Sequence, residues 1–176
     1  MPVPPPTARL VFREMTPDDL DAMHRLLGDP VVMWVYPEPY TREQVAEWIA
    51  MNRRSYRDRG FGLWILALRE TGEFVGECGL TPQALATGPE IELGYHVLPG
   101  FQGHGLATEA AVACRDFARD VARLDRIVSL IDPRNLASQR VAAKVGLVLE
   151  GEIAVPTKVL GVYATSFQAP AGRPCP

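Results

Sequence analysis

The segment Leu98–Ala110, LPGFQGHGLATEA, decides the fold class more clearly than any other part of the chain. An apolar stretch ends at a proline, a glycine-rich loop follows, and a run of small residues with helical spacing begins. Successive backbone N–H groups of such a loop converge, and the N-terminus of the helix adds partial positive charge at the same place. The segment therefore predicts a strand–loop–helix unit with an anion site, best suited to a phosphate or pyrophosphate group.

Two common nucleotide-binding loops fit this segment poorly. A Walker A loop needs Lys and then Ser or Thr after its last glycine, whereas Leu106 and Ala107 follow Gly105. A Rossmann loop needs Gly or Ala where Thr108 stands, and it follows the first strand of its domain rather than a strand in mid-chain. A dinucleotide binder is therefore the weaker alternative.

Outward from this loop, hydrophobic periodicity and capping residues predict an alternation of strands and helices. The order β-α-α-β-β-β-α-β-α-β-β indicates an α/β fold: one mixed sheet of about seven strands flanked by helices. A loop is expected at 81–89. The expected strands are 9–14, 63–68, 74–80, 90–97, 126–131, 147–153 and 157–167, and the expected helices with their caps are 16–28, 41–60, 106–121 and 135–144.

Composition narrows the class of protein. The chain has 176 residues, of which 47% are hydrophobic and 22% charged, and its formal net charge is −3. This length predicts one domain with its own core, and the acidic balance argues against a nucleic-acid-binding surface. No apolar run reaches the ~20 residues of a membrane helix, and we expect no membrane partner. Without a signal peptide or metal-ligand spacing, the three cysteines indicate a cytoplasmic protein without a metal.

The prolines are concentrated at the two ends of the chain. Four of the 16 lie in the first six residues and three in the last seven. Because proline fixes φ and lacks a backbone donor, residues 1–7 and 169–176 are predicted to be extended, unpacked tails. The folded domain is then expected to span residues 8–168.

Four ordered motifs resemble one known family. Gln102–Ala107 (QGHGLA) resembles the Q/R-x-x-G-x-G/A acyl-CoA-binding motif of the GNAT N-acetyltransferase superfamily. The resemblance extends from Arg9 to about Phe167. The remaining motifs resemble the RimJ/RimL-like branch of that superfamily: Glu92–Tyr95 (ELGY), Ala107–Ala110 (ATEA), and Asn135–Ser138 (NLAS) ahead of Lys144–Leu147 (KVGL).

The resemblance implies an acetyl-CoA-dependent N-acetyltransferase with the GNAT fold. Acetyl-CoA would lie in a V-shaped opening between the fourth and fifth strands, and the acetyl group would pass directly to a primary amine, on a protein N-terminus or a small molecule. Asn135 would contact the cofactor near its thiol, and Ser138 would donate to the departing thiolate. Val97 and Leu98 would pair with the pantetheine amides, and the pyrophosphate would be held by backbone N–H groups of Gln102, Gly103, His104, Gly105, Leu106 and Ala107.

Acetyl transfer to an amine needs a group that accepts the proton of the amine. Strand alternation puts Glu90, Glu92 and His96 on one face of their strand, where they could simply form a polar surface. The resemblance places Glu92 in the acceptor site as the general base, acting directly or through water, with His96 as the second candidate. Many GNAT enzymes carry a tyrosine acid on the last helix where this chain has Ala142. Ser138 would then donate to the thiolate in place of that tyrosine. The alternative function is a non-catalytic acyl-CoA-binding module.

Two side-chain clusters carry weaker signals. The cations Arg53, Arg54, Arg57 and Arg59 end the second helix, where they form a solvated face or border an acidic acceptor. The aromatic residues between the first two helices line the acceptor site or cover the core: Trp34, Tyr36 and Tyr40. The expected oligomeric state is a monomer or a homodimer.

Overall fold

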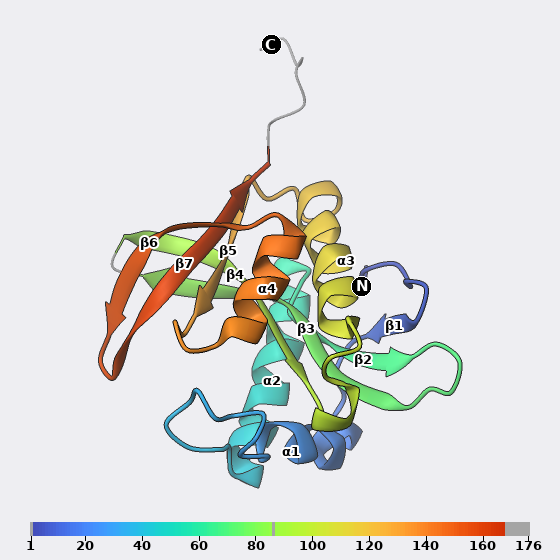
Figure 1. Cartoon of the computed structure of the whole chain (residues 1–176). Helices are drawn as coiled ribbons and strands as arrows, with labels where there is room; N and C mark the ends of the chain where they lie inside the picture. The colour runs from blue at the N-terminus through green and yellow to red at the C-terminus, as the bar shows by residue number, and fades with distance from the viewer. Residues whose placement is uncertain (1, 86, 168–176) are drawn as a thin grey trace.

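A seven-stranded mixed sheet, in the order β1-β2-β3-β4-β5-β7-β6, carries helices on both faces in this computed structural model, which describes residues 2–85 and 87–167 (Figure 1). The order of strands and helices along the chain is the predicted one, so the mixed α/β class is confirmed. The strands are β1 (Leu10–Arg13), β2 (Leu63–Leu68), β3 (Phe74–Leu85), β4 (Gly88–Val97), β5 (Arg126–Ile131), β6 (Val148–Val155) and β7 (Lys158–Ser166). The helices are α1 (Leu20–Leu27), α2 (Arg42–Arg59), α3 (Leu106–Asp120) and α4 (Leu136–Val145), with short 3-10 turns η1 (Pro17–Asp19) and η2 (Pro99–Phe101).

Helix ends follow the capping residues closely. The Thr41 hydroxyl accepts a hydrogen bond from the amide of Gln44, and the side-chain oxygen of Gln44 accepts one from the amide of Thr41, so α2 begins at a complete capping box. The helix ends at Gly60, which adopts a left-handed φ of 80°. Local chemistry alone fixes these ends.

The expected loop at 81–89 is wrong. β3 continues to Leu85 and β4 begins at Gly88, and the two strands form a long hairpin whose register pairs Leu80 with Leu93 and Leu85 with Gly88. The segment has no alternation of apolar residues and contains prolines, which disfavour a strand assignment. Pairing between β3 and β4 overrides these local preferences.

Neighbouring residues of β3 face opposite helix layers. The carboxylate of Glu77 accepts a hydrogen bond from Trp48 of α2, whereas the next side chain, Cys78, contacts Cys114 of α3. α1 and α2 therefore cover one face of the sheet, and α3 and α4 cover the other (Figure 1). Cys78 and Cys114 are fully buried core residues, as their positions in the apolar pattern predicted.

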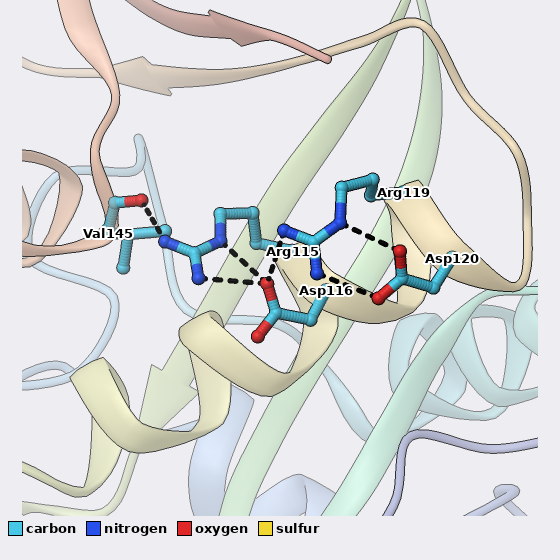
Figure 2. A network of polar contacts seen from close by, with 5 residues as sticks. All are labelled: Arg115, Asp116, Arg119, Asp120 and Val145. Atoms are coloured by element: carbon cyan, nitrogen blue, oxygen red, sulfur yellow. Dashed lines mark hydrogen bonds and ion pairs between the residues drawn. The ribbon is translucent and has the colours of Figure 1, made fainter. Parts of the chain in front are cut away.

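Arg115 fixes α4 against α3. Its Nη1 donates to the carbonyl of Val145, the last residue of α4, at 2.7 Å, and Asp116 binds the same guanidinium at 2.8 Å (Figure 2). The carbonyls at the end of a helix lack intrahelical donors, so a cation there both satisfies a backbone group and suits the helix dipole. The contact holds the helix that carries Ser138.

The N-terminal segment departs from the expectation of an unpacked tail. Residues 2–7 form no helix or strand, yet Val3 packs on the core and Pro4 is buried. Thr7 donates to the carboxylate of Glu109 in α3 at 2.6 Å. Apolar contacts and the hydrogen bonds of Thr7 hold a segment whose proline-rich composition predicts an unpacked tail. The predicted tail at 169–176 lies outside the described residues.

A close backbone approach at Gly79 gives a test of the fold. A Cβ atom at this position would collide with the carbonyl oxygen of Gly62, so Gly79→Ala is expected to lower the free energy of unfolding by about 1–3 kcal/mol. Gly94 is paired with Gly79 across the strands, but a Cβ there would lie 3.7 Å from its nearest neighbour, Cδ2 of Leu63. Urea unfolding should show Gly94→Ala close to wild type, and equal stability of the two variants would contradict this packing.

Candidate active site

The sheet opens between β4 and β5. These parallel strands are joined at one register pair, Glu92 with Val128. Beyond it, side chains replace the backbone ladder: Ser129 Oγ donates to the carbonyl of Leu93 at 2.7 Å, and the amide of Leu130 donates to Oε1 of Glu92 at 3.3 Å. The strands therefore diverge from Glu92 towards their carboxyl ends, which is the V-shaped opening expected between the fourth and fifth strands.

A glycine-rich loop follows the end of β4. Gly103 and Gly105 adopt left-handed φ values of 78° and 80°, which side chains other than glycine rarely tolerate. Gly105 is the N-cap of α3 and has no side chain to satisfy the first amides of that helix. Residues 102–105 are exposed. The loop can therefore present backbone N–H groups and the positive end of α3 to an anion.

The outer side of this loop is fixed by Arg9. Its Nη1 donates to the carbonyl of His104 at 2.9 Å, and its Nε donates to Oε2 of Glu109 at 2.7 Å. Burial would raise the pKa of Glu109, but hydrogen bonds from Thr7 and Arg9 lower it below its usual value. The contact of Arg9 with this loop was not predicted from the sequence. The one sequence feature that points to it is the position of Glu109 in the first turn of α3, where an acidic side chain is favoured.

The two residues expected to pair with pantetheine differ in their backbone contacts. The N–H of Leu98 donates to Val75 on β3 at 2.9 Å and its carbonyl accepts from Phe101, so neither group points into the opening. The carbonyls of Val97 and Leu93 lie on the opposite side, where they accept from Gln102 Nε2 and Ser129 Oγ. Strand alternation gives Tyr95 the same orientation as these two residues. Strand alternation therefore favours Tyr95 over Leu98 as the residue whose backbone groups, with those of Val97, face the opening.

Asn135 and Ser138 lie at the start of α4. The side-chain oxygen of Asn135 accepts from the amide of Ser138 at 3.0 Å, so Asn135 is a helix cap as predicted. The carbonyl of Ser138 accepts from the hydroxyl of Tyr95 at 3.0 Å, which ties α4 to β4 across the opening. Burial raises the pKa of Tyr95, so its phenol stays protonated and donates. Ala142, where many GNAT enzymes have a tyrosine, is buried.

Glu92 lies at the apex of the opening. Its Oε2 accepts from Gln83 Nε2 at 2.6 Å, and its Oε1 accepts from the amide of Leu130. Burial raises the pKa of Glu92, although these two hydrogen bonds and the nearby His96 oppose the shift. A carboxylate with a raised pKa at a strand opening has the properties of a proton acceptor.

A second carboxylate, Glu77, lies on the same face of the sheet. It is fully buried, and its register partner on β4 is His96. Its Oε1 is 2.9 Å from His96 Nδ1, and its Oε2 accepts from Trp48 Nε1 at 3.0 Å. His96 Nε2 is 3.1 Å from the hydroxyl of Tyr36. Glu77 was not predicted as a site residue, because its contact with His96 depends on the register of β3 against β4.

The loop between α1 and α2 covers this face. The ring of Trp34 lies against the guanidinium of Arg134, and the ring of Tyr36 against the ammonium of Lys158, which also donates to the carbonyl of Val35. Asp132 pairs with both cations, and its hydrogen bond from Arg134 is the main cause that holds its pKa well below the usual range. Trp34 and Tyr36 therefore lie beside the opening, whereas Tyr40 packs edge-on against Trp48 of α2 and covers the core.

The arginine cluster at the end of α2 has a different position. Arg53 lines a shallow hollow between α2 and the η1–α1 segment, together with Pro17 and Leu20. Arg57 donates to the carbonyl of Arg53. These contacts give no link to the β4–β5 opening and agree with a solvated face.

The partly buried carboxylate of Glu92 predicts a pH-dependent stability. Because its pKa is raised above 4.5 in the folded protein, the free energy of unfolding should fall as pH rises through the interval between 4.5 and the raised value. Glu92→Gln removes this loss. The variant is expected to melt above wild type at about pH 8, and the difference should disappear near pH 4. A constant difference in melting temperature across this range would contradict the assignment.

Among residues 2–85 and 87–167, no group of three or more His, Cys, Asp or Glu side chains is placed to hold a metal ion. No helix in the same part of the chain is long and apolar enough to cross a membrane.

Comparison with known proteins adds independent findings. The profile of the acetyltransferase (GNAT) domain matches residues 9–148. An uncharacterized protein of Bacillus subtilis (strain 168), YkkB, is 37% identical over 158 residues, covering 89% of this chain and 92% of YkkB. The crystal structure of an acetyltransferase from Agrobacterium tumefaciens str. C58 superposes with a TM-score of 0.81 at 30% identity, covering 95% of this chain and 96% of that one. RimL, a ribosomal L7/L12 alpha-N-protein acetyltransferase solved in complex with coenzyme A, has the same fold, with a TM-score of 0.73 at 19% identity over 93% of this chain and 97% of RimL.

Proposed function

The chain belongs to the GNAT acetyltransferase family, and we propose that it transfers the acetyl group of acetyl-CoA directly to a primary amine at the β4–β5 opening. The observation that carries the proposal is the juxtaposition of two sites. An exposed glycine-rich loop that can present backbone N–H groups to an anion follows β4, and Glu92 of the same strand, a carboxylate with a raised pKa, lies at the apex of the opening. The first suits a phosphate-bearing thioester and the second suits an amine that must lose a proton.

The residues at the opening fit acetyl-CoA, which supplies an acetyl group activated as a thioester. We propose that the backbone N–H groups of residues 103–107 hold its pyrophosphate and that the backbone N–H of Val97 pairs with the pantetheine chain. The amide of Gln102, which was predicted to bind the pyrophosphate, instead donates to the carbonyl of Pro99 at 3.2 Å, and its side chain donates to the carbonyl of Val97. Leu98 adjoins the cofactor without such pairing, because both of its backbone groups have internal partners. Asn135 positions the start of α4 near the thiol end.

The chemistry then assigns roles to two side chains. Glu92 accepts a proton from the acceptor nitrogen, directly or through water, which leaves the lone pair to attack the thioester carbonyl. The Ser138 hydroxyl donates to the thiolate as it departs, and a backbone N–H near Val97 polarises the carbonyl. A positioned base contributes about 10²–10⁴-fold to a rate.

The acceptor class follows from the family resemblance. The ELGY, ATEA and NLAS motifs support membership of the RimJ/RimL-like branch, and we propose a protein N-terminus or a small-molecule amine as the acceptor. The aromatic rings of Trp34 and Tyr36 beside the opening suit the aliphatic part of either.

Ligand binding and thiol release test this function. Acetyl-CoA is expected to raise the melting temperature, whereas NAD should not. A panel of amines and peptide N-termini, screened for release of free CoA thiol, should contain at least one acceptor. Stabilisation by acetyl-CoA without thiol release from any amine would support the non-catalytic CoA-binding module instead, and stabilisation by NAD alone would support a dinucleotide binder.

A further inference from the structure

Glu77 is a buried carboxylate that the proposed chemistry leaves without a role. Its side chain is completely buried, and its hydrogen-bonding partners are an imidazole and an indole rather than a lysine or arginine. A buried carboxylate is costly unless it is well paired, and such groups are concentrated at functional sites. Its position beside the acceptor face therefore calls for a functional explanation.

The contacts of Glu77 orient His96. A carboxylate at 2.9 Å from Nδ1 keeps the proton of a neutral imidazole on that nitrogen, as in other carboxylate–histidine pairs. His96 Nε2 is then an acceptor, and the atom 3.1 Å from it is the hydroxyl of Tyr36. Trp48 fixes the other carboxylate oxygen and prevents Glu77 from turning away.

Tyr36 connects this pair to the acceptor site. Its side chain is 39% exposed, but its hydroxyl points inward to His96. Glu92 and His96 lie on the same face of β4, so the Tyr36 hydroxyl that contacts His96 lies on the face that carries Glu92. An amine held beside Glu92 would therefore lie on the same face of the sheet as the Tyr36 oxygen.

The stoichiometry of acetyl transfer needs a second proton acceptor. An ammonium ion that becomes an amide loses two protons, one that ends on the thiol and one that enters solvent. Glu92 can take the first proton before the nitrogen attacks. The second leaves the nitrogen after the new C–N bond has formed, when the carboxylate of Glu92 is already protonated or is exchanging its proton.

We propose that His96, positioned by Glu77, receives this second proton through the hydroxyl of Tyr36. The proposal rests on the proposed acetyltransferase function and extends it. An N–H bond of the adduct breaks as its proton binds the Tyr36 oxygen, while the original Tyr36 proton passes to His96 Nε2. The resulting imidazolium faces the Glu77 carboxylate, and His96 and Glu92 each return a proton to solvent after the product leaves. Ser138 recovers from solvent the proton that it gives to the thiolate, so the net change is one proton on the thiol and one released. In this scheme His96 and Tyr36 move the proton and Glu77 is a positioning residue.

The tautomer of His96 can be measured without an acceptor. The chain has three histidines, so ¹⁵N NMR of the imidazoles is readily assigned with the variant His96→Gln. We expect His96 to carry its proton on Nδ1, with Nε2 unprotonated, and Glu77→Gln to change this spectrum while His24 and His104 keep theirs. A wild-type His96 that carries a proton on Nε2 would overturn the proposal.

Kinetics test this proton relay from Tyr36 to His96, with the acceptor amine that is identified by thiol release. His96→Gln, Tyr36→Phe and Glu77→Gln are each expected to lower kcat by about 10–100-fold, with the KM for acetyl-CoA within about two-fold of wild type. Glu90→Gln is the control, because Glu90 lies on the same strand face but pairs with Arg126. Unchanged kcat in His96→Gln and Tyr36→Phe would overturn the relay alone. Absence of turnover by the wild type with every amine would overturn the acetyltransferase proposal itself, and the relay with it.

Discussion

Replacement of Gly103 by glutamate is expected to abolish acetyl-CoA binding while the protein remains folded. A Cβ atom at this position meets no other atom within 4 Å, so the new side chain extends into the space in front of the loop. There it brings a negative charge to the site proposed for the pyrophosphate. Two like charges at 4 Å repel by about 4 kcal/mol near a protein surface, equivalent to a loss of roughly 10³-fold in affinity. Isothermal titration calorimetry with acetyl-CoA measures the effect.

Gly72→Glu is a matched control for this variant. Gly72 has nearly the same backbone conformation, with φ of 74°, and a Cβ there also meets no atom within 4 Å. It lies in the turn between β2 and β3, outside the loop. Both variants should lose comparable stability from the left-handed backbone, but only Gly103→Glu should lose binding. Wild-type affinity in Gly103→Glu would show that the loop is not the phosphate site.

Replacement of Glu92 by glutamine is expected to lower kcat by about 10²–10⁴-fold with little change in the affinity for acetyl-CoA. The glutamine side-chain oxygen can still accept from the amide of Leu130, so the apex of the opening keeps its shape. A neutral amide cannot take the proton of the acceptor. Steady-state kinetics with an identified amine, together with calorimetric binding of acetyl-CoA, separate these two effects.

The control for Glu92→Gln is the same substitution two residues earlier. Glu90 shares the strand and the face but pairs with Arg126 at 3.2 Å, so Glu90→Gln should retain wild-type kcat. Full activity of Glu92→Gln at every pH would remove Glu92 from the mechanism.

Local chemistry accounts for the parts of the fold that the sequence predicted best. The capping box at Thr41 and the left-handed Gly60 bound α2, and Asn135 with Gly146 bounds α4, because each signal acts within a few residues of the helix end. The strand extension at 81–89 depended instead on cross-strand pairing. The contact between Thr7 and Glu109 joins residues 102 positions apart, which composition cannot reveal.

The site residues also divide into those set by local sequence and those set by long-range contacts. The glycine loop and the face that carries Glu92 were readable from spacing and strand alternation. Leu98 was assigned pantetheine pairing by resemblance, but its amide bonds Val75 on the neighbouring strand. Glu77 and Tyr36 come together at His96 only through the register of two strands and the path of a loop, so no local pattern identifies them.

The most direct test of the central claim is the fate of the acetyl group. The protein would be incubated with ¹³C-labelled acetyl-CoA, a panel of small amines and peptides with free N-termini, and the products analysed by mass spectrometry. The account predicts that the label appears on the nitrogen of an amine, with one free CoA thiol for each acetyl group transferred, and that Gly103→Glu yields neither. Tight binding of acetyl-CoA with no labelled amine and no thiol release would contradict it.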